Sequence, residues 1–231
     1  RAPLFHSVGP AVLEYYYATK TPNDYLLCGP SGIGYNYLSA YSNWRDFLDQ
    51  TAEVMRQTSL RSIYIINRKV RHVSGGKVEH QLKDEVMNYT FEELKEFGGI
   101  KDRHGADLVD PEAMQRYFEA LPEALGFFQG WESLPGENPH RVDGRLWVPT
   151  SALVRSDIEG TLNEFLAAAQ RQEGPVFVSG HVNCYDAAMD DIIQAADRLR
   201  QKGFEVVRPD VFLRLGQDAC RRGWVELQTT A

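Results

Sequence analysis

Runs of apolar residues, each bounded by turn-forming residues, recur along the chain and alternate with segments of helical periodicity. The apolar runs cover 3–8, 24–28, 61–67, 124–131, 145–154, 174–180 and 204–212. Most of these runs are near-continuous, which is typical of strands buried on both faces of a parallel sheet. Such strands alternating with helices predict βα units, arranged as a barrel or an open sheet. We expect an α/β fold: a single (β/α) barrel-like domain over 1–231, with about seven parallel strands.

Helical spacing of apolar residues follows Asn43 and recurs over 157–172 and 186–203. Two further helix starts are predicted from local sequence. Thr90 and Glu93 form a capping box, and Asp110 precedes a proline at the first helical position. Because the first apolar run begins only two residues into the chain, we expect the barrel to be incomplete at its N-terminus, with an upstream segment of the same protein as a partner.

The segment 68–89 is highly charged, carries "SGG" in its middle and is long for a βα connection. It is either a solvated excursion, such as a hairpin, or a lid over the functional site. Long loops in compact domains often carry function, so both alternatives stay open.

Composition excludes several classes of function. The 25 Lys and Arg against 32 Asp and Glu give a net charge of −7 without a basic cluster, so a nucleic-acid partner is not expected. No apolar run is long enough to cross a membrane. The three cysteines are widely spaced and form no CxxC motif, which argues against a disulfide framework and a structural zinc site. We expect neither a metal nor another cofactor.

The stretch "GPSGIGY" (29–35) follows the second apolar run and contains a G-x-G motif, but no complete phosphate-binding fingerprint. In parallel βα folds, ligands bind at the carboxyl ends of strands. Tyrosine rings either pack such a loop onto the fold or present flat faces and hydroxyl groups to a sugar. We assign Ser31, Tyr35 and Tyr37 as candidate substrate-binding residues, together with Asn67 at the end of the next run.

Trp131 and Glu132 directly follow the run at 124–131. A tryptophan beside a carboxylate could form a sugar platform with an acid or base, because burial against an indole raises the pKa of a carboxyl group. The alternative is a tryptophan that closes the end of the fold and a glutamate that pairs with an arginine.

His181 and Asn183 follow the run at 174–180, where His181 could carry a proton or bind a metal. We expect Asp186 to cap the helix that follows. At the final run, Asp210 either caps the last helix or serves as a second carboxylate opposite Glu132, as glycoside hydrolysis requires.

The loop and its surroundings resemble the signature of the GxGYxYP family, which is grouped with the glycoside hydrolases. Gly32, Gly34, Tyr35 and Tyr37 match the motif, whereas Leu38 stands where the motif has proline. The resemblance is strongest over 9–41 and 175–213. It implies a barrel-like catalytic domain, a carbohydrate substrate and an extracellular or periplasmic location. It supplies no secure catalytic pair, and the acidic "DGDN"-like segment of the family's N-terminal portion is absent here.

Three functions follow as hypotheses. The first is a carbohydrate-active hydrolase with Glu132, His181 and Asp210 as catalytic residues and with Asn183 and Trp131 contacting the sugar. The second is a glycan-binding module without catalysis. The third is a metal-dependent deacetylase-like hydrolase, suggested by His6 and His181 at the ends of predicted strands.

Overall fold

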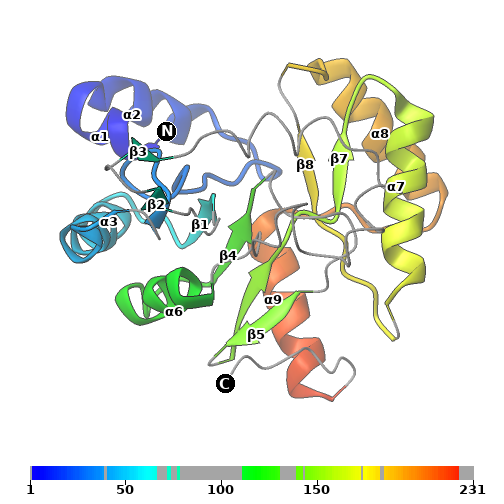
Figure 1. Cartoon of the computed structure of the whole chain (residues 1–231). Helices are drawn as coiled ribbons and strands as arrows, with labels where there is room; N and C mark the ends of the chain where they lie inside the picture. Colours follow the sequence, from blue (N-terminus) through cyan, green and yellow to red (C-terminus); the bar gives the residue numbers. More distant parts are fainter. Residues whose placement is uncertain are drawn as a thin grey trace. The chain divides into compact units, whose positions relative to one another are not determined.

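The structure, a computed structural model, describes residues 2–38, 41–66, 72–73, 77–78, 111–130, 139–142, 144–172, 174–182 and 185–223 (Figure 1). The chain divides into two compact units. One comprises Arg1–Leu13 with Leu27–Ala124, and the other comprises Glu14–Leu26 with Leu125–Ala231. Each unit is described by itself below.

The described part of the first unit contains three whole helices and three short strands. Its elements are α1 (Ala2–Val8), α3 (Trp44–Gln57), β1 (Ser62–Ile65), β2 (His72–Val73), β3 (Lys77–Val78) and α6 (Pro111–Ala120). Helix α2 (Pro10–Thr19) runs across the boundary between the units. Helix α3 contacts both α1 and α6. The core collects buried side chains from α3, β1 and α6, among them Leu48, Ile63, Ile65, Met114 and Phe118.

The second unit contains two small sheets with helices packed on them. The sheet strands are β4 (Gly126–Gln129), β5 (His140–Val142), β6 (Arg145–Val148), β7 (Ala152–Val154) and β8 (Gly180–Val182). The helices are α7 (Ile158–Gln170), α8 (Met189–Gln201) and α9 (Pro209–Arg221). Figure 1 shows α7 and α8 beside the β7–β8 pair and α9 beside β6, in agreement with the contacts between these elements.

Each sheet of the second unit has its own core. Strand β6 pairs in parallel with β4 and antiparallel with β5, and β7 pairs in parallel with β8. Leu146 and Val148 of β6 pack with Leu213 and Cys220 of α9. Under the β7–β8 sheet, buried side chains from β7, α7 and α8 form a separate cluster: Ala152, Val154, Leu162, Phe165, Ala195 and Leu199.

The expected barrel of seven parallel strands is wrong, although the α/β class is right. The described strands are short, lie in small sheets and form no closed barrel, and β5 runs antiparallel to its neighbour. Pro149 divides the run at 145–154 into β6 and β7, which belong to different sheets. A proline lacks the N–H that would continue a ladder, so the chain changes sheet at this point.

Two of the expected strands do not form. Residues 3–8 belong to α1, and the run at 204–212 contains no strand but leads into α9 at Pro209. Proline is favoured at the first position of a helix, where its missing N–H would have no partner. In the run at 24–28, the strand is reduced to one parallel bridge between Cys28 and Ile63.

Several local predictions are confirmed. Helices α3 and α7 lie where the periodicity placed them, and the Asp157 side chain accepts a hydrogen bond from the Gly160 N–H at the start of α7. Helix α8 begins later than expected: Asp191, not Asp186, reaches back to the N–H of Ala188. None of the described helices combines the length and apolar character that crossing a bilayer requires.

Two further expectations concern residues near the gaps in the described chain. Within 68–89, the strands β2 and β3 pair antiparallel, as a hairpin does. The rest of that segment and the predicted capping box at Thr90 lie outside the described residues.

Candidate functional site

The glycine-rich loop 29–38 leaves the carboxyl end of a short parallel pairing. The Cys28 N–H donates to the Ser62 carbonyl oxygen (3.0 Å), and the Tyr64 N–H donates to the Cys28 carbonyl oxygen (2.8 Å). The Ser31 N–H then donates to the Tyr64 carbonyl oxygen (2.8 Å), which extends the ladder into the loop. The first part of the loop is therefore held by backbone hydrogen bonds to β1, at the strand end where ligands bind in parallel sheets.

Ser31 is the anchor of the loop. Its side chain is completely buried and its φ of +60° lies in the left-handed region, which costs free energy in a residue other than glycine. The Ser31 hydroxyl oxygen accepts a hydrogen bond from the Ile66 N–H (3.2 Å), and the Ser31 carbonyl oxygen accepts one from the Tyr117 hydroxyl (2.8 Å). Burial raises the pKa of Tyr117, which keeps its phenol protonated as a donor. This predicted ligand-binding residue thus supports the loop from inside.

Gly32 brings the loop against α3. Its φ is +126°, and a Cβ at this position would lie 2.4 Å from the Thr51 hydroxyl oxygen. The same hydroxyl oxygen accepts a hydrogen bond from the Ile33 N–H (3.2 Å) and donates one to the Phe47 carbonyl oxygen (2.7 Å). The first glycine of the motif is therefore required by a close approach as well as by its backbone angle.

Tyr35 and Tyr37 form the outer part of the loop. Their hydroxyl oxygens lie 3.3 Å apart, and their rings meet edge to face with centroids 5.9 Å apart. Tyr35 is 54% exposed, whereas Leu38, at the proline position of the motif, is buried. The loop thus ends on an apolar anchor and presents two tyrosines between its anchored ends. Aromatic faces with adjacent hydroxyls are suited to a sugar ring.

His181 lies in β8, opposite Leu153 of β7 in the parallel register. Its side chain is half-buried, and desolvation lowers the pKa of the imidazole. The side chain is therefore neutral at neutral pH and can accept a proton. Gly180, just before it, packs so closely that an added Cβ would lie 2.5 Å from the Phe165 ring.

Asp210 sits in the first turn of α9, and Arg208 rather than Asp210 occupies the capping position. The carboxylate accepts two hydrogen bonds from the Arg208 guanidinium, at 3.0 and 3.1 Å. Arg208 also donates to the Pro22 carbonyl oxygen. The pair ties the start of α9 to the segment before Leu27, which is a structural task.

A polar cluster at the carboxyl ends of β4 and β6 was not anticipated from the sequence. The Trp147 Nε1 donates to the Gln129 side-chain oxygen (2.6 Å), and the Thr150 hydroxyl donates to the Gln129 carbonyl oxygen (2.7 Å). All three residues are buried. The polar Gln129 at the end of an apolar run was the available signal. The cluster fixes the backbone just before Trp131.

Four predicted site residues lie outside the described residues: Asn67, Trp131, Glu132 and Asn183. Of the others, Ser31, Tyr35 and Tyr37 share one loop of the first unit, and His181 and Asp210 lie on different elements of the second. Thr51 and Tyr117, which support the loop, were not anticipated, because nothing in the sequence pairs them with residues so far away in the chain.

Nucleophilic and metal chemistry find little support among the described residues. Cys28 is buried, and desolvation raises the pKa of its thiol to about 12, so it stays protonated at neutral pH. The described residues contain no group of three His, Cys, Asp or Glu side chains placed to hold a metal ion. His6 lies on α1, not at the end of a strand.

Comparison with known proteins relates the chain to one family. The sequence model described as "GxGYxYP putative glycoside hydrolase C-terminal domain" matches residues 2–217. No curated protein shows significant sequence similarity to the chain. One solved structure, described as a "putative hydrolase from Bacteroides thetaiotaomicron VPI-5482", is 18% identical with a TM-score of 0.63 and shares the fold. The alignment covers 94% of this chain and 37% of that protein, so the chain spans well under half of the length of that protein.

Proposed function

The chain belongs to the GxGYxYP C-terminal domain family, and from this premise we propose that it supplies the carbohydrate-binding surface of a glycoside hydrolase-like protein. The observation that carries the proposal is the tyrosine pair: Tyr35 and Tyr37 stand on an anchored loop at a strand's carboxyl end, with their hydroxyl oxygens 3.3 Å apart. The ligand would be a glycan met outside the cytoplasm, as the secreted proteins of the family imply.

Anchoring gives the tyrosine pair an energetic advantage in binding. A flexible loop loses conformational entropy when a ligand orders it, whereas a preorganised loop has already lost most of it on folding. Residues 31–33 are fixed by hydrogen bonds to β1, α3 and α6. Tyr35 and Tyr37 restrict each other through their edge-to-face contact. More of the stacking free energy therefore remains available as affinity.

For the hydrolytic step, we propose Glu132 as the acid or base, with Trp131 lining the sugar subsite and Asn67 among the polar contacts. His181 and Asn183 would orient a hydroxyl group or water; a half-buried, neutral imidazole suits that task. Asp210 stays a prediction as the second carboxylate, and its two hydrogen bonds from Arg208 compete with that role.

A non-catalytic glycan-binding module is the second candidate. It is favoured by the same Arg208–Asp210 pair, which occupies a carboxylate otherwise offered to catalysis. In this alternative, the tyrosine loop holds the glycan and any bond cleavage occurs elsewhere in a longer protein. A chain that spans 37% of the related structure is compatible with such a division of labour.

The binding proposal is tested by titrating the chain with oligosaccharides from a panel of bacterial and plant polysaccharides and measuring heat. Replacing both tyrosines, in Tyr35→Ala/Tyr37→Ala, should weaken binding about thirtyfold, because each aromatic face contributes on the order of 1 kcal/mol. Tyr15→Ala, which removes another exposed ring on α2, is the matched control and should bind as the parent does. Equal affinity of all three proteins would reject the tyrosine pair as the binding surface.

A measurement of glycan cleavage distinguishes the hydrolase from the non-catalytic binding module. The glycan that binds best is incubated with the chain, and with any longer natural protein that contains it, and released sugars are measured. Glu132→Gln should abolish release without weakening binding if Glu132 is the acid or base. Binding without release in every protein would leave the non-catalytic module as the function.

A further inference from the structure

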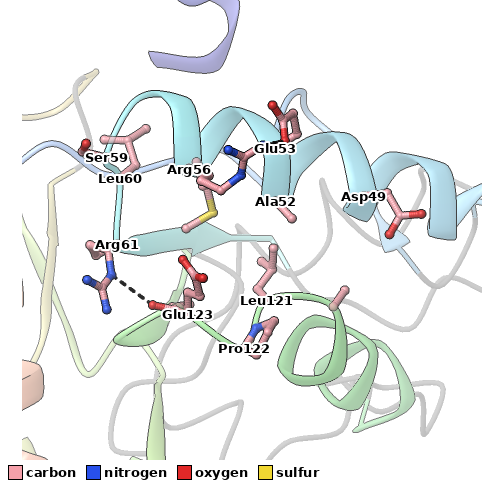
Figure 2. A pocket seen from close by; sticks show the side chains of 13 residues that line it. Asp49, Ala52, Glu53, Arg56, Ser59, Leu60, Arg61, Leu121, Pro122 and Glu123 are labelled. Atoms are coloured by element: carbon pink, nitrogen blue, oxygen red, sulfur yellow. Dashed lines mark hydrogen bonds and ion pairs between the residues drawn. The ribbon is translucent and has the colours of Figure 1, made fainter.

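A concave site in the first unit lies away from the tyrosine loop. It is a pocket of about 540 Å³ between the C-terminal half of α3, the turn 59–61 and the turn 120–124 that follows α6 (Figure 2). Volumes of this size are typical of small-molecule sites in proteins. The turn 59–61 leads into the amino end of β1, whereas the tyrosine loop is anchored at the carboxyl end of the same strand.

The floor of the pocket is apolar and rigid. Met55, Leu60, Leu121 and Ala124 line it and are each at most 5% exposed. Met55 comes from α3, whereas Leu121 comes from the turn after α6, which Figure 2 shows across the pocket from that helix. Because this lining is already almost fully buried, the gain of about 25 cal/mol per Å² would come chiefly from burying the apolar body of the ligand.

The wall formed by the end of α3 has its backbone satisfied. Ser59 adopts a left-handed conformation with φ +56°, and the Leu60 N–H donates back to the Met55 carbonyl oxygen (2.9 Å). This closure is the usual one for a helix C-terminus, although a serine stands where glycine is preferred. The Met55 carbonyl oxygen is thus engaged within the helix end, and the charged side chains at the rim select the ligand.

Two opposite charges stand at one end of the pocket. The Arg61 Nε donates to the Glu123 backbone carbonyl oxygen (3.0 Å), which fixes the guanidinium at the rim while the Glu123 side chain extends over the floor (Figure 2). Within the described chain, neither side chain belongs to an ion pair, in contrast to the Arg56–Glu53 pair on the upper rim. A fixed guanidinium is well suited to a carboxylate, and the Glu123 carboxylate to an ammonium group.

We infer that this pocket binds a small zwitterion with an apolar side chain, that is, a free α-amino acid of the leucine, methionine or phenylalanine type. The ligand carboxylate pairs with Arg61, its ammonium pairs with Glu123, and its side chain lies over Met55 and Leu121. A simple carboxylic acid meets repulsion from Glu123, and a simple amine meets repulsion from Arg61. A zwitterion satisfies both charges at once.

The inference goes beyond the carbohydrate proposal, because it concerns another ligand and the other end of β1. Four strand residues separate the two sites, which is about 13 Å of extended chain. Amino-acid binding at the pocket and glycan binding at the tyrosine loop are therefore measured independently. Failure to detect one does not contradict the other.

The test is calorimetric titration of the chain with L-leucine, L-methionine and L-phenylalanine. Because the charges lie at an exposed rim, we expect dissociation constants of about 10 μM to 1 mM for the best ligand. N-acetyl-L-leucine lacks the ammonium group and L-leucinamide lacks the carboxylate. Each should bind at least about fivefold more weakly than L-leucine. Absence of saturable binding by all three amino acids overturns the inference.

Variants locate the site. Arg61→Gln and Glu123→Gln should each weaken binding of the free amino acid about fivefold, and Ala52→Leu should block it by filling the pocket from α3. Arg200→Gln is the matched control, because Arg200 pairs with Asp197 on α8 and does not line the pocket. Circular dichroism and thermal melts identify any variant that fails to fold. Binding that is unchanged in folded Arg61→Gln and Glu123→Gln proteins assigns the amino acid to another place and overturns the inference.

Discussion

The Tyr117 hydroxyl, on α6, donates a 2.8 Å hydrogen bond to the carbonyl oxygen of Ser31, a residue 86 positions earlier in the chain. Both residues are buried, and Ser31 carries the left-handed backbone conformation from which the loop turns outward. The position of the tyrosine pair therefore depends on a helix that is remote from it in the sequence.

Removal of the Tyr117 hydroxyl should lower the free energy of unfolding of the protein. Tyr117→Phe strands a buried carbonyl oxygen, which costs about 1–3 kcal/mol of unfolding free energy. Urea denaturation followed by fluorescence measures the change. Tyr15→Phe, which changes an exposed tyrosine on α2, should stay within about 0.5 kcal/mol of the parent. Equal stabilities of the two variants would contradict the anchoring role of Tyr117.

The two glycines of the motif should respond differently to alanine. Gly32→Ala places a Cβ against Thr51 at a positive φ, so we expect a loss of about 1–3 kcal/mol. Gly34→Ala meets no atom within 4 Å and should leave the free energy of unfolding almost unchanged. Thermal and urea denaturation of both variants compare the two positions directly.

Gly34→Ala also probes the ligand. If a sugar approaches the backbone at this position, the variant binds glycan more weakly at full stability. A Gly34→Ala protein that is less stable than Gly32→Ala would show that the steric account of the loop is incorrect.

His181 should make stability fall on mild acidification. Burial lowers its folded-state pKa, so below about pH 6.5 the unfolded state binds the proton more readily than the folded state. The contribution of the neutral imidazole is complete above the unfolded pKa and is lost as pH falls through the folded pKa. Urea denaturation at pH 7.5, 6.0 and 5.0 should show this loss, and His181→Gln should flatten it. A His181 NMR titration midpoint at or above 6.5 would be the opposite result.

Variants of the Arg208–Asp210 pair test whether Asp210 has a structural or a catalytic role. Arg208→Gln and Asp210→Asn should each lower the free energy of unfolding. The loss in the double variant should be smaller than the sum of the two single losses. For this partly buried pair we expect a coupling free energy of about 1 kcal/mol. Additive stabilities, together with loss of glycan cleavage in Asp210→Asn alone, would instead assign Asp210 to the reaction.

Local signals in the sequence predicted much of the helical structure. The spacing of Phe47, Leu48 and Met55 places them on the inward face of α3, where all three are buried. The strand end before the tyrosine loop and the unusual backbone angle at Gly32 were also accessible, because they follow from short-range turn chemistry, whereas the close approach of Gly32 to Thr51 was not.

The barrel could not be excluded from the sequence, because short apolar runs are compatible with helices and with buried strands. Two apolar runs, 3–8 and 204–212, resemble in composition the runs that form strands. The first lies in α1, and the second leads into α9. Pro149 and Pro209 carried the corrective information, as a strand break and a helix start. The contacts of Tyr117 and Thr51 with the loop join residues that are distant in the chain. Local patterns in a single sequence do not reveal such contacts.

The two halves of the loop differ: residues 28–33 are held to the interior by hydrogen bonds, whereas Tyr35 is exposed and Tyr37 is half-buried. Selection can therefore act on the two halves separately. Under the proposed glycan-binding function, exchange of an outer side chain would alter the preferred sugar with little change in stability, whereas changes in the inner half would be selected against because they destabilise the unit. Proteins that share this scaffold could then change the glycan they bind by substitution at positions 35 and 37 alone.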